Sequence, residues 1–363
     1  VLDKQLLPMI DYGVEFVTAI QHGSRIYAAS RTGIYRLSED VQSAELVFSF
    51  GTTFTYACAL NSTGQVLFLT GGSSSTTTSV YRSFDGTTWE LWKAYTATNR
   101  WYISGAGNGG YILIEHTGAG RVGTLGAVDG SEVIANFDPA NINYWGANIF
   151  YHPQPLVINP LSNNKLWASR SALASINADN SISSLDSVMG ALGITISIPI
   201  GDEGVFVAGF KQGDFVGWSE LKVTTDGTSW SPYGTESLAD TSGATTFGSA
   251  IYTKFGILHT ISETSIANAR DRYTFLVSPG VTVLASGQAG YANPADQVCS
   301  QFLFPLSDTE FLFLGRLNHN TSPTSGQILR LYGEPPETPE FWTAFVKTYE
   351  VRCANIRNPG RTG

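Results

Sequence analysis

One pattern constrains this chain more than any other: a polar turn followed at once by a short apolar strand, which returns seven times. The first apolar residues of the seven strands are Ile26, Val66, Tyr111, Leu166, Val205, Ile257 and Phe311. Successive copies are about 40 to 55 residues apart, a period at which repeat folds place one supersecondary unit per repeat. The sequence therefore predicts several similar units in one fold, rather than two or more unrelated domains.

The seven strands carry apolar residues at successive positions, as in Leu67-Phe68-Leu69. A strand of this kind is buried on both faces, so we expect each to be the second strand of a four-stranded unit. No segment of about 12 or more residues shows helical periodicity, which indicates an all-β fold. We expect units at 14–50, 51–98, 99–140, 148–190, 191–240, 241–290 and 297–346. The unit from Pro155 to Val188 has a weak outer strand, so six units plus an irregular segment is the alternative.

A turn sequence with a hydroxyl residue, Asp-Gly and Trp occurs twice, each time between two β-type runs. The two copies are Ser83, Asp85, Gly86 and Trp89, and Thr224, Asp226, Gly227 and Trp230. The Asp can accept hydrogen bonds from backbone N–H groups ahead of it, the Gly supplies a positive φ, and the Trp folds back as an apolar plug of its own unit. We expect a structural hairpin turn that needs no partner elsewhere in the chain.

Both copies resemble the Asp-box, or BNR repeat, the turn between the third and fourth strands of blades in many β-propellers. The usual pattern is Ser-x-Asp-x-Gly-x-Thr-Trp, and both copies here are one residue shorter between Asp and Trp. The resemblance implies a single seven-bladed β-propeller over residues 14–346, with six blades as the alternative. Proteins with such boxes include sialidases, other glycosidases, lectin-like proteins and bacteriophage virion proteins, so the resemblance implies a fold and not an activity. Ser38-Glu39-Asp40 is interpreted as a turn of another kind at the same position.

Residues 1–13 and 347–363 lie outside the repeat, and we expect them to form an N-terminal arm and a C-terminal tail. A ring of blades must close, and a terminal strand that pairs with the blade at the opposite end of the chain removes two exposed strand edges. One of the two segments is expected to close the ring, and the other to dock a neighbouring subunit.

Composition argues against several classes of function. The formal net charge is −9 and only 14% of the residues are charged, which leaves no basic stripe for nucleic-acid phosphates. No apolar run reaches the roughly 18 residues that cross a bilayer, and residues 1–7 lack the features of a signal peptide. We therefore expect no nucleic acid, no membrane insertion, and a protein made in a host cytoplasm that is carried outside in a virion.

A catalytic constellation is not found in the sequence. Sialidases resemble one another in an Arg-Ile-Pro signature, and its nearest match, Arg25-Ile26-Tyr27, lacks the proline. Acids that could serve a glycosidase mechanism stand in turns, at Asp202, Glu203, Asp214, Asp308 and Glu310. The histidines form no metal-ligand pair, and they are His22, His116, His152, His259 and His319. The cysteines match no zinc pattern and are expected to be small buried residues, at Cys58, Cys299 and Cys353. We expect no catalytic residue, no metal and no cofactor.

The sequence favours a structural or adhesive subunit of a larger particle, with a bacteriophage tail or virion protein as the leading case. Its partners would be the other protein subunits of the assembly. A glycan-binding propeller is the alternative, and surface aromatics that could stack on sugars are Trp101, Tyr102, Tyr144 and Trp145. A glycoside hydrolase or sialidase-like enzyme is the second alternative.

Overall fold

The computed structural model contains strands, turns and bends, and none of the residues it describes is helical. The described residues are 2–54, 57–62, 65–74, 77–96, 101–106, 110–117, 120–127, 132–135, 157–158, 165–169, 172–176, 182–184, 192–200, 204–211, 219–224, 231–232, 244–265, 270–278, 282–290, 302–315 and 325–333. Between positions 101 and 250, the described residues are described by their backbone. The all-β prediction is confirmed for these ranges.

The described strands form seven antiparallel sheets, which we number in chain order. Sheet 1 contains β3 (Thr18–His22), β4 (Arg25–Ala29), β5 (Gly33–Leu37) and β6 (Ala44–Ser49). Sheet 2 contains β7 (Ala57–Ser62), β8 (Leu67–Ser74), β9 (Thr77–Ser83) and β10 (Glu90–Thr96). Sheet 3 contains β11 (Trp101–Ala106), β12 (Gly110–Thr117), β13 (Gly120–Ala127) and β14 (Glu132–Ala135).

The remaining sheets follow the same strand order. Sheet 4 contains β15 (Val157–Ile158), β16 (Lys165–Ser169), β17 (Ala172–Ile176) and β18 (Ile182–Ser184). Sheet 5 contains β19 (Leu192–Ile200), β20 (Gly204–Lys211), β21 (Ser219–Thr224) and β22 (Ser231–Pro232). Sheet 6 contains β23 (Ala244–Thr253), β24 (Gly256–Ser265), β25 (Arg270–Ser278) and β26 (Thr282–Gly290). Sheet 7 contains β27 (Phe302–Pro305), β28 (Glu310–Gly315), β29 (Ser325–Gly333) and the N-terminal strands β1 (Leu2–Leu6) and β2 (Ile10–Asp11).

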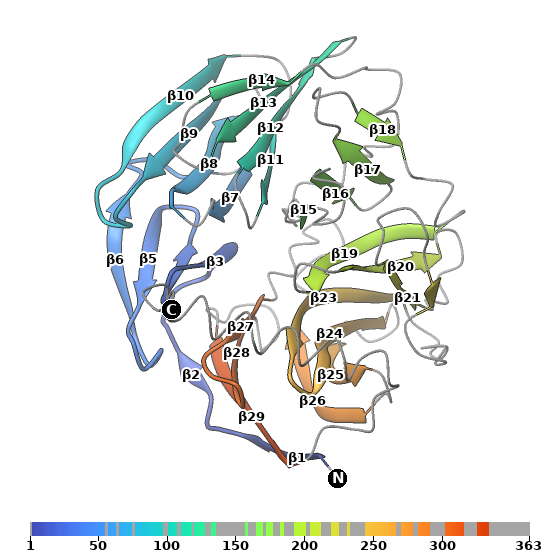
Figure 1. Ribbon diagram of the computed structural model, residues 1–363. Helices are drawn as coiled ribbons and strands as arrows, with labels where there is room; N and C mark the ends of the chain where they lie inside the picture. Colours follow the sequence, from blue (N-terminus) through green and yellow to red (C-terminus); the bar gives the residue numbers. More distant parts are fainter. Residues whose placement is uncertain are drawn as a thin grey trace, which may run out of the picture.

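The sheets are arranged around a common centre (Figure 1). The first strand of a sheet lies beside the first strand of the next at several of the junctions, so that β27 contacts β3, β3 contacts β7, β7 contacts β11, and β19 contacts β23. In the first two sheets the fourth strands, β6 and β10, lie at the outer edge of the ring (Figure 1). Apart from β1 and β2 in sheet 7, the strands of each sheet lie within one of the segments predicted for the seven units, and β18 is the short outer strand of sheet 4.

Each of the seven predicted apolar strands is the second strand of its sheet, or directly precedes it in the case of Val66. Their burial on both faces has a clear cause in β28. Phe311 and Phe313 pack into a cluster with Phe255 of sheet 6, whereas Leu312 and Leu314 pack into a cluster with residues of sheet 1. Successive side chains point to opposite faces of a strand, so one strand supplies both junctions of its sheet. The prediction that these are second strands is confirmed, and burial on both faces is confirmed for the described side chains of β4, β8 and β28.

The N-terminal arm supplies the outer strand of the last sheet. β1 pairs antiparallel with β29, with Leu2 opposite Gly333 and Leu6 opposite Leu329. β2 continues along the same strand, with Ile10 opposite Gly326. Of the two segments that could close the ring, the N-terminal one therefore joins the opposite end of the chain. Residues 347–363 lie outside the described ranges.

Candidate functional site

The turn between β9 and β10 is held by one carboxylate. Asp85 Oδ1 accepts hydrogen bonds from the backbone N–H groups of Thr87 (2.8 Å) and Thr88 (2.6 Å), and Asp85 Oδ2 accepts one from Thr88 Oγ1 (2.8 Å). The Ser83 hydroxyl donates to Asp85 Oδ1 (3.1 Å) and accepts from Gly86 N–H (2.8 Å). The hydrogen bonds from the Thr88 and Thr87 backbone hold the pKa of Asp85 well below its usual range. The turn therefore holds the Asp85 carboxylate in its charged form.

The same turn also rests on the neighbouring sheet. Gly86 has a φ of 74°, a conformation that favours glycine. A Cβ atom at this position would overlap the hydroxyl of Tyr27, a buried residue of β4 in sheet 1. Glycine is thus required twice, once by the backbone conformation and once by the close approach of Tyr27. The expectation of a turn with no partner elsewhere is wrong, because the space for this turn is set by another sheet.

Trp89 fills the space between sheets 1 and 2. Its ring stacks on Phe48 of β6, with centroids 5.9 Å apart, and it packs against the apolar cluster that contains Tyr27, Leu67 and Leu69. The indole N–H is buried without a hydrogen-bond partner among the described residues. The expectation that the indole plugs its own unit is corrected here, because the ring belongs to the junction of two sheets.

The second copy of the motif falls at the corresponding position of sheet 5. Thr224 is the last residue of β21, and β22 begins at Ser231, so the segment between them joins a third strand to a fourth. Asp226, Gly227 and Trp230 lie outside the described residues.

The turn from Ser38 to Ser43 shares several features with the turn at Asp85. The Ser38 hydroxyl donates to Asp40 Oδ1 (2.6 Å), which also accepts from Gln42 N–H (3.1 Å). The Ser38 side chain and the Gln42 backbone lower the pKa of Asp40. Val41, directly after the Asp, has a φ of 56°, as Gly86 has a positive φ directly after Asp85. Ser38-Glu39-Asp40, interpreted as a turn of another kind, therefore shares the Ser–Asp contact and the positive φ with the turn at Asp85.

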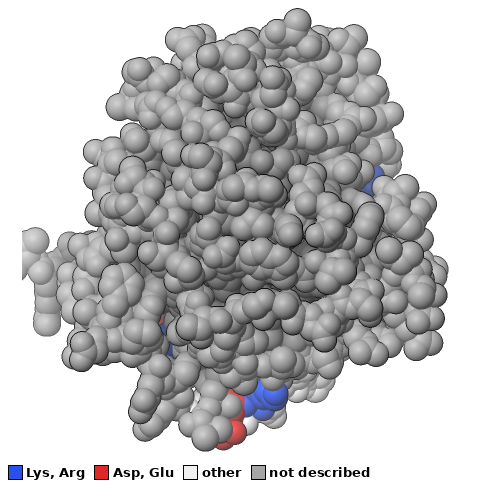
Figure 2. Space-filling view, turned by 90° about the vertical axis from the view of Figure 1, so that its right-hand side faces the viewer, with Lys and Arg blue, Asp and Glu red and all other residues white. Residues whose placement is uncertain are grey.

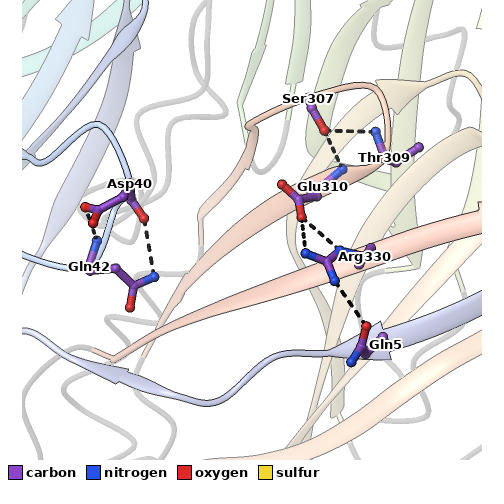
Figure 3. A network of polar contacts seen from close by, with 7 residues as sticks. All are labelled: Gln5, Asp40, Gln42, Ser307, Thr309, Glu310 and Arg330. Atoms are coloured by element: carbon purple, nitrogen blue, oxygen red, sulfur yellow. Dashed lines mark hydrogen bonds and ion pairs between the residues drawn. The ribbon is translucent and has the colours of Figure 1, made fainter.

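An Arg in the third strand recurs at one register position of sheets 1, 2 and 7. Arg36 lies opposite Glu45 and Arg82 lies opposite Glu90 in the fourth strands. Both pairs are ion pairs, at 2.8 Å and 2.5 Å. In sheet 7, Arg330 lies between Glu310 of β28 and Gln5 of β1 (Figure 3).

The residue after each of these fourth-strand polar groups is an exposed leucine. Leu6 lies opposite Leu329, Leu46 opposite Tyr35, and Leu91 opposite Tyr81. The three leucines are 36%, 51% and 54% exposed, and we call them the rim stripe. A register shift follows Leu46 and Leu91 at the next residue of the strand, which hinders edge-to-edge pairing with another strand. The rim stripe is therefore suited to side-chain contact more than to strand addition.

The rim stripe was not predicted, although the sequence carries a signal for it. Tyr-Arg occurs at Tyr35-Arg36 and Tyr81-Arg82, and Glu-Leu occurs at Glu45-Leu46 and Glu90-Leu91. Both repeats are about 45 residues apart, the period of the units. Their alignment in space depends on strand register, which the separate dipeptides do not specify.

The sialidase-like Arg25 takes part in an exposed ion pair. Its guanidinium lies 2.5 Å from Glu39 Oε1, and the pair links the β3–β4 turn to the β5–β6 turn. In an antiparallel four-stranded sheet these two turns lie at the same end, which is also the end that carries the Asp40 turn. Arg25 thus joins two structural turns.

The other candidate residues are dispersed. Glu310 pairs with Arg330, and Asp308 is exposed in the turn before it. His22 Nδ1 lies 2.8 Å from Ser62 Oγ, and burial lowers the pKa of His22. Cys58 is partly buried, its thiol donates to Ser30 O (3.4 Å), and burial raises the pKa of the thiol to about 12. Side chains that lie outside the description are those of Asp202, Glu203, Asp214, His116, His152, His259, His319, Cys299, Cys353, Trp101, Tyr102, Tyr144 and Trp145.

Within the described ranges, no three His, Cys, Asp or Glu residues are grouped so as to hold a metal ion. The same ranges contain no helix that is long and apolar enough to cross a membrane. On the face in Figure 2, acidic and basic side chains lie next to each other at the lower edge.

Comparison with solved structures gives similarity in fold. The BP39L lectin from Burkholderia pseudomallei is 10% identical, with a TM-score of 0.54, over 84% of this chain and 93% of the lectin. The extracellular domain of a hybrid two-component system protein from B. thetaiotaomicron is 11% identical, with a TM-score of 0.52, over 89% of this chain and 39% of that chain. No protein-family model and no curated protein matches the sequence. The lectin is a β-propeller, and the chain described here has an all-β propeller fold.

Proposed function

We propose that this chain is a seven-bladed β-propeller with Asp-box-like turns and that it works as a structural or adhesive subunit of a larger particle. The single observation that carries the proposal is the rim stripe. Leu6, Leu46 and Leu91 occupy the same register position on the outer strands of three sheets that follow one another around the ring. Apolar side chains repeated on one surface are typical of a protein interaction site.

The charges around the stripe support a protein partner of low charge. Arg36 and Arg82 are each paired with a glutamate of their own sheet, so a partner need not supply a counter-charge. The core of a protein interface is poor in unpaired charges and rich in apolar side chains. A disc that buries about 1,000 Å² or more along its rim would form a stable contact.

A bacteriophage tail or virion is the particle we propose, on the Asp-box-like turns and the low content of charged residues. The chain would then be recovered from purified particles in a fixed ratio to a tail or capsid protein. Leu46→Ser combined with Leu91→Ser should weaken that association at least tenfold, because two exposed anchors are lost without a change in the buried core. Phe84→Ser is the matched control, since Phe84 is similarly exposed but lies off the stripe.

We also propose that the chain is not an enzyme. The support is that Arg25 and Glu310 are each engaged in ion pairs and that Asp85 is held in its charged form by the turn. The purified protein should therefore release no sugar from sialosides or aryl glycosides from about pH 4 to pH 8, where glycosidase acids operate. Turnover that Arg25→Ala abolishes would contradict the structural role and favour a sialidase-like enzyme.

One observation favours glycan binding as a second candidate. The Phe84 ring is 55% exposed, and the Arg82 guanidinium lies 5.3 Å from its centroid and pairs with Glu90. An exposed ring beside charged hydrogen-bonding groups suits the stacking and polar recognition of a sugar. Binding on a glycan array that is lost in Phe84→Ser and kept in the stripe variant would select this candidate over a protein partner.

A further inference from the structure

The N-terminal strand β1 occupies the same place as β6 and β10, but it is held differently. Opposite the recurring Arg, the fourth strands of sheets 1 and 2 carry Glu45 and Glu90, whereas β1 carries Gln5. The second strands carry Tyr27 and Phe68 in sheets 1 and 2, whereas β28 carries Glu310 in sheet 7. The carboxylate that pairs with the Arg therefore stands on the second strand in sheet 7 and on the fourth strand in sheets 1 and 2.

The position of the carboxylate determines whether the Arg keeps its ion pair when the outer strand detaches. Glu310 Oε1 accepts from Arg330 Nε at 2.8 Å and from Arg330 Nη2 at 2.5 Å, while Gln5 Oε1 accepts from Nη1 at 3.3 Å (Figure 3). Loss of β1 thus leaves the Arg330 ion pair in place. Loss of β6 or β10 would instead remove the carboxylate from Arg36 or Arg82.

The chain connections also hold β1 less tightly than β6 and β10. β6 and β10 follow their third strands through short turns, whereas Gln5 and Arg330 are 325 residues apart in the chain. Leu7 still bonds to β29, because its N–H donates to the Ile328 carbonyl at 2.9 Å. Between Leu7 and β2 lie Pro8 and Met9, and Met9 is 52% exposed. After β2, the Tyr12 hydroxyl donates to the Val41 carbonyl at 2.6 Å and anchors the chain to sheet 1. β1 and Leu7 can therefore detach together at residues 8–9 while β2 and Tyr12 stay in place.

We propose that the outer edge of β29 is a strand-acceptor site and that its partner is β1 of a second copy of this chain. The strand from the second copy has the sequence that already fits the site, with Asp3 opposite Tyr332 and Leu6 opposite Leu329. Exchange of an identical element between protomers is a low-cost route to a dimer, because each pairing between chains replaces the same pairing in the single molecule. This inference rests on the proposed role as a subunit, and the exchange links copies of the chain to one another.

Disulfide trapping on the purified full-length chain tests the exchange. In a background with Cys299→Ser and Cys353→Ser, one preparation carries Asp3→Cys and another carries Tyr332→Cys. These residues face each other in the β1–β29 register, and opposite residues of antiparallel strands lie within disulfide reach. After incubation of the mixture and oxidation with oxidised glutathione, we expect a dimer that contains one chain of each kind.

Two controls separate exchange from collision. The double variant with both cysteines in one chain should form an internal disulfide, stay monomeric and no longer exchange. Asp3→Cys mixed with Leu91→Cys, a similarly exposed rim position, should give at least fivefold less dimer. A mixture that stays monomeric while the double variant closes its internal disulfide would overturn the proposal, as would equal yields with Tyr332→Cys and Leu91→Cys.

Gln5→Glu tests whether the carboxylate missing from β1 is the reason that β1 exchanges. This change gives β1 the carboxylate that β6 and β10 possess, so the arm should be held more tightly and the yield of mixed dimer should fall by about two- to fivefold, as expected for an exposed ion pair. An unchanged yield would overturn the role of the missing carboxylate. The trapping assay contains this chain alone, so its failure leaves the rim-stripe test standing, and failure of the rim-stripe test leaves the exchange standing.

Discussion

The turns at Ser38–Ser43 and Ser83–Trp89 stand at the same position of two consecutive sheets, yet they differ in the residue that follows the Asp. In both, a Ser-x-Asp sequence directs the Asp carboxylate to backbone N–H groups ahead of it, and the residue after the Asp has a positive φ. That residue is Val41 in one turn and Gly86 in the other. A positive φ after the Asp is thus common to both turns, and the side chain at that position is not.

The neighbouring sheet explains the difference. Gly86 is approached by the Tyr27 hydroxyl, which leaves no room for a Cβ atom. Val41 is 4% exposed and packs into the cluster between sheets 7 and 1, and Tyr12 donates to its carbonyl. Just before the fourth-strand Glu, sheet 2 has Trp89 where sheet 1 has Ala44. The space at the junction is filled by an indole in one case and by Val41 and the N-terminal arm in the other.

Gly86→Val should have the largest effect, because it places the side chain of one turn into the other. The β-branched residue would overlap Tyr27 and adopt a positive φ, at a cost of about 3 to 5 kcal/mol in the free energy of unfolding. Urea unfolding followed by tryptophan fluorescence measures this change. Wild-type stability in this variant would show that Tyr27 does not limit the turn.

Trp89→Ala gives sheet 2 the residue that sheet 1 has at the corresponding position. We expect a loss of about 2 to 4 kcal/mol, since the stacking on Phe48 is lost and a cavity opens between sheets 1 and 2. Leu91→Ala, at an exposed position of the same strand, is the control and should change stability by less than about 0.5 kcal/mol. Equal effects of the two changes would contradict the role of the indole at the junction.

Val41→Gly gives sheet 1 the residue that sheet 2 has after the Asp. Relief of the positive φ offsets part of the loss of buried apolar surface, so the net destabilisation should be about 1 to 2 kcal/mol. Val41→Ala separates the two terms, because it removes apolar surface but keeps a Cβ atom at positive φ. The comparison predicts that Val41→Ala is at least as destabilising as Val41→Gly, and the reverse order would contradict it.

The smallest effect concerns the two aspartates. The pKa of Asp85 lies below its unfolded value, so its stabilisation is present above about pH 4 and is lost as the pH falls toward the folded pKa. Asp85→Asn should therefore flatten the fall in the free energy of unfolding below about pH 4, by about 1 kcal/mol after allowance for its exposure. Asp40→Asn should act in the same direction and less strongly, because fewer backbone N–H groups contact Asp40. Identical pH profiles for Asp85→Asn and the wild type would refute the carboxylate's role.

The strands and their turns could be predicted from the sequence alone. Runs such as Leu67-Phe68-Leu69 specify a strand covered on both faces, and Asp85-Gly86 specifies a turn with a positive φ, because both signals act over a few neighbouring residues. All seven second strands were located for this reason. One of the two Asp-Gly-Trp copies is described in full and adopts a hairpin turn stabilised by its Asp.

Tertiary structure alone decided which residues meet across the sheets. The sequence around Gly86 does not predict its contact with Tyr27, and the sequence around Val41 does not predict a positive φ for a β-branched residue. Both depend on the side chains of the adjacent sheet. The rim stripe depends on register between strands, and the pairing of β1 with β29 joins residues more than 300 positions apart. Contacts at such separations follow from the packing of the whole chain, because local periodicity specifies a strand but not its partner.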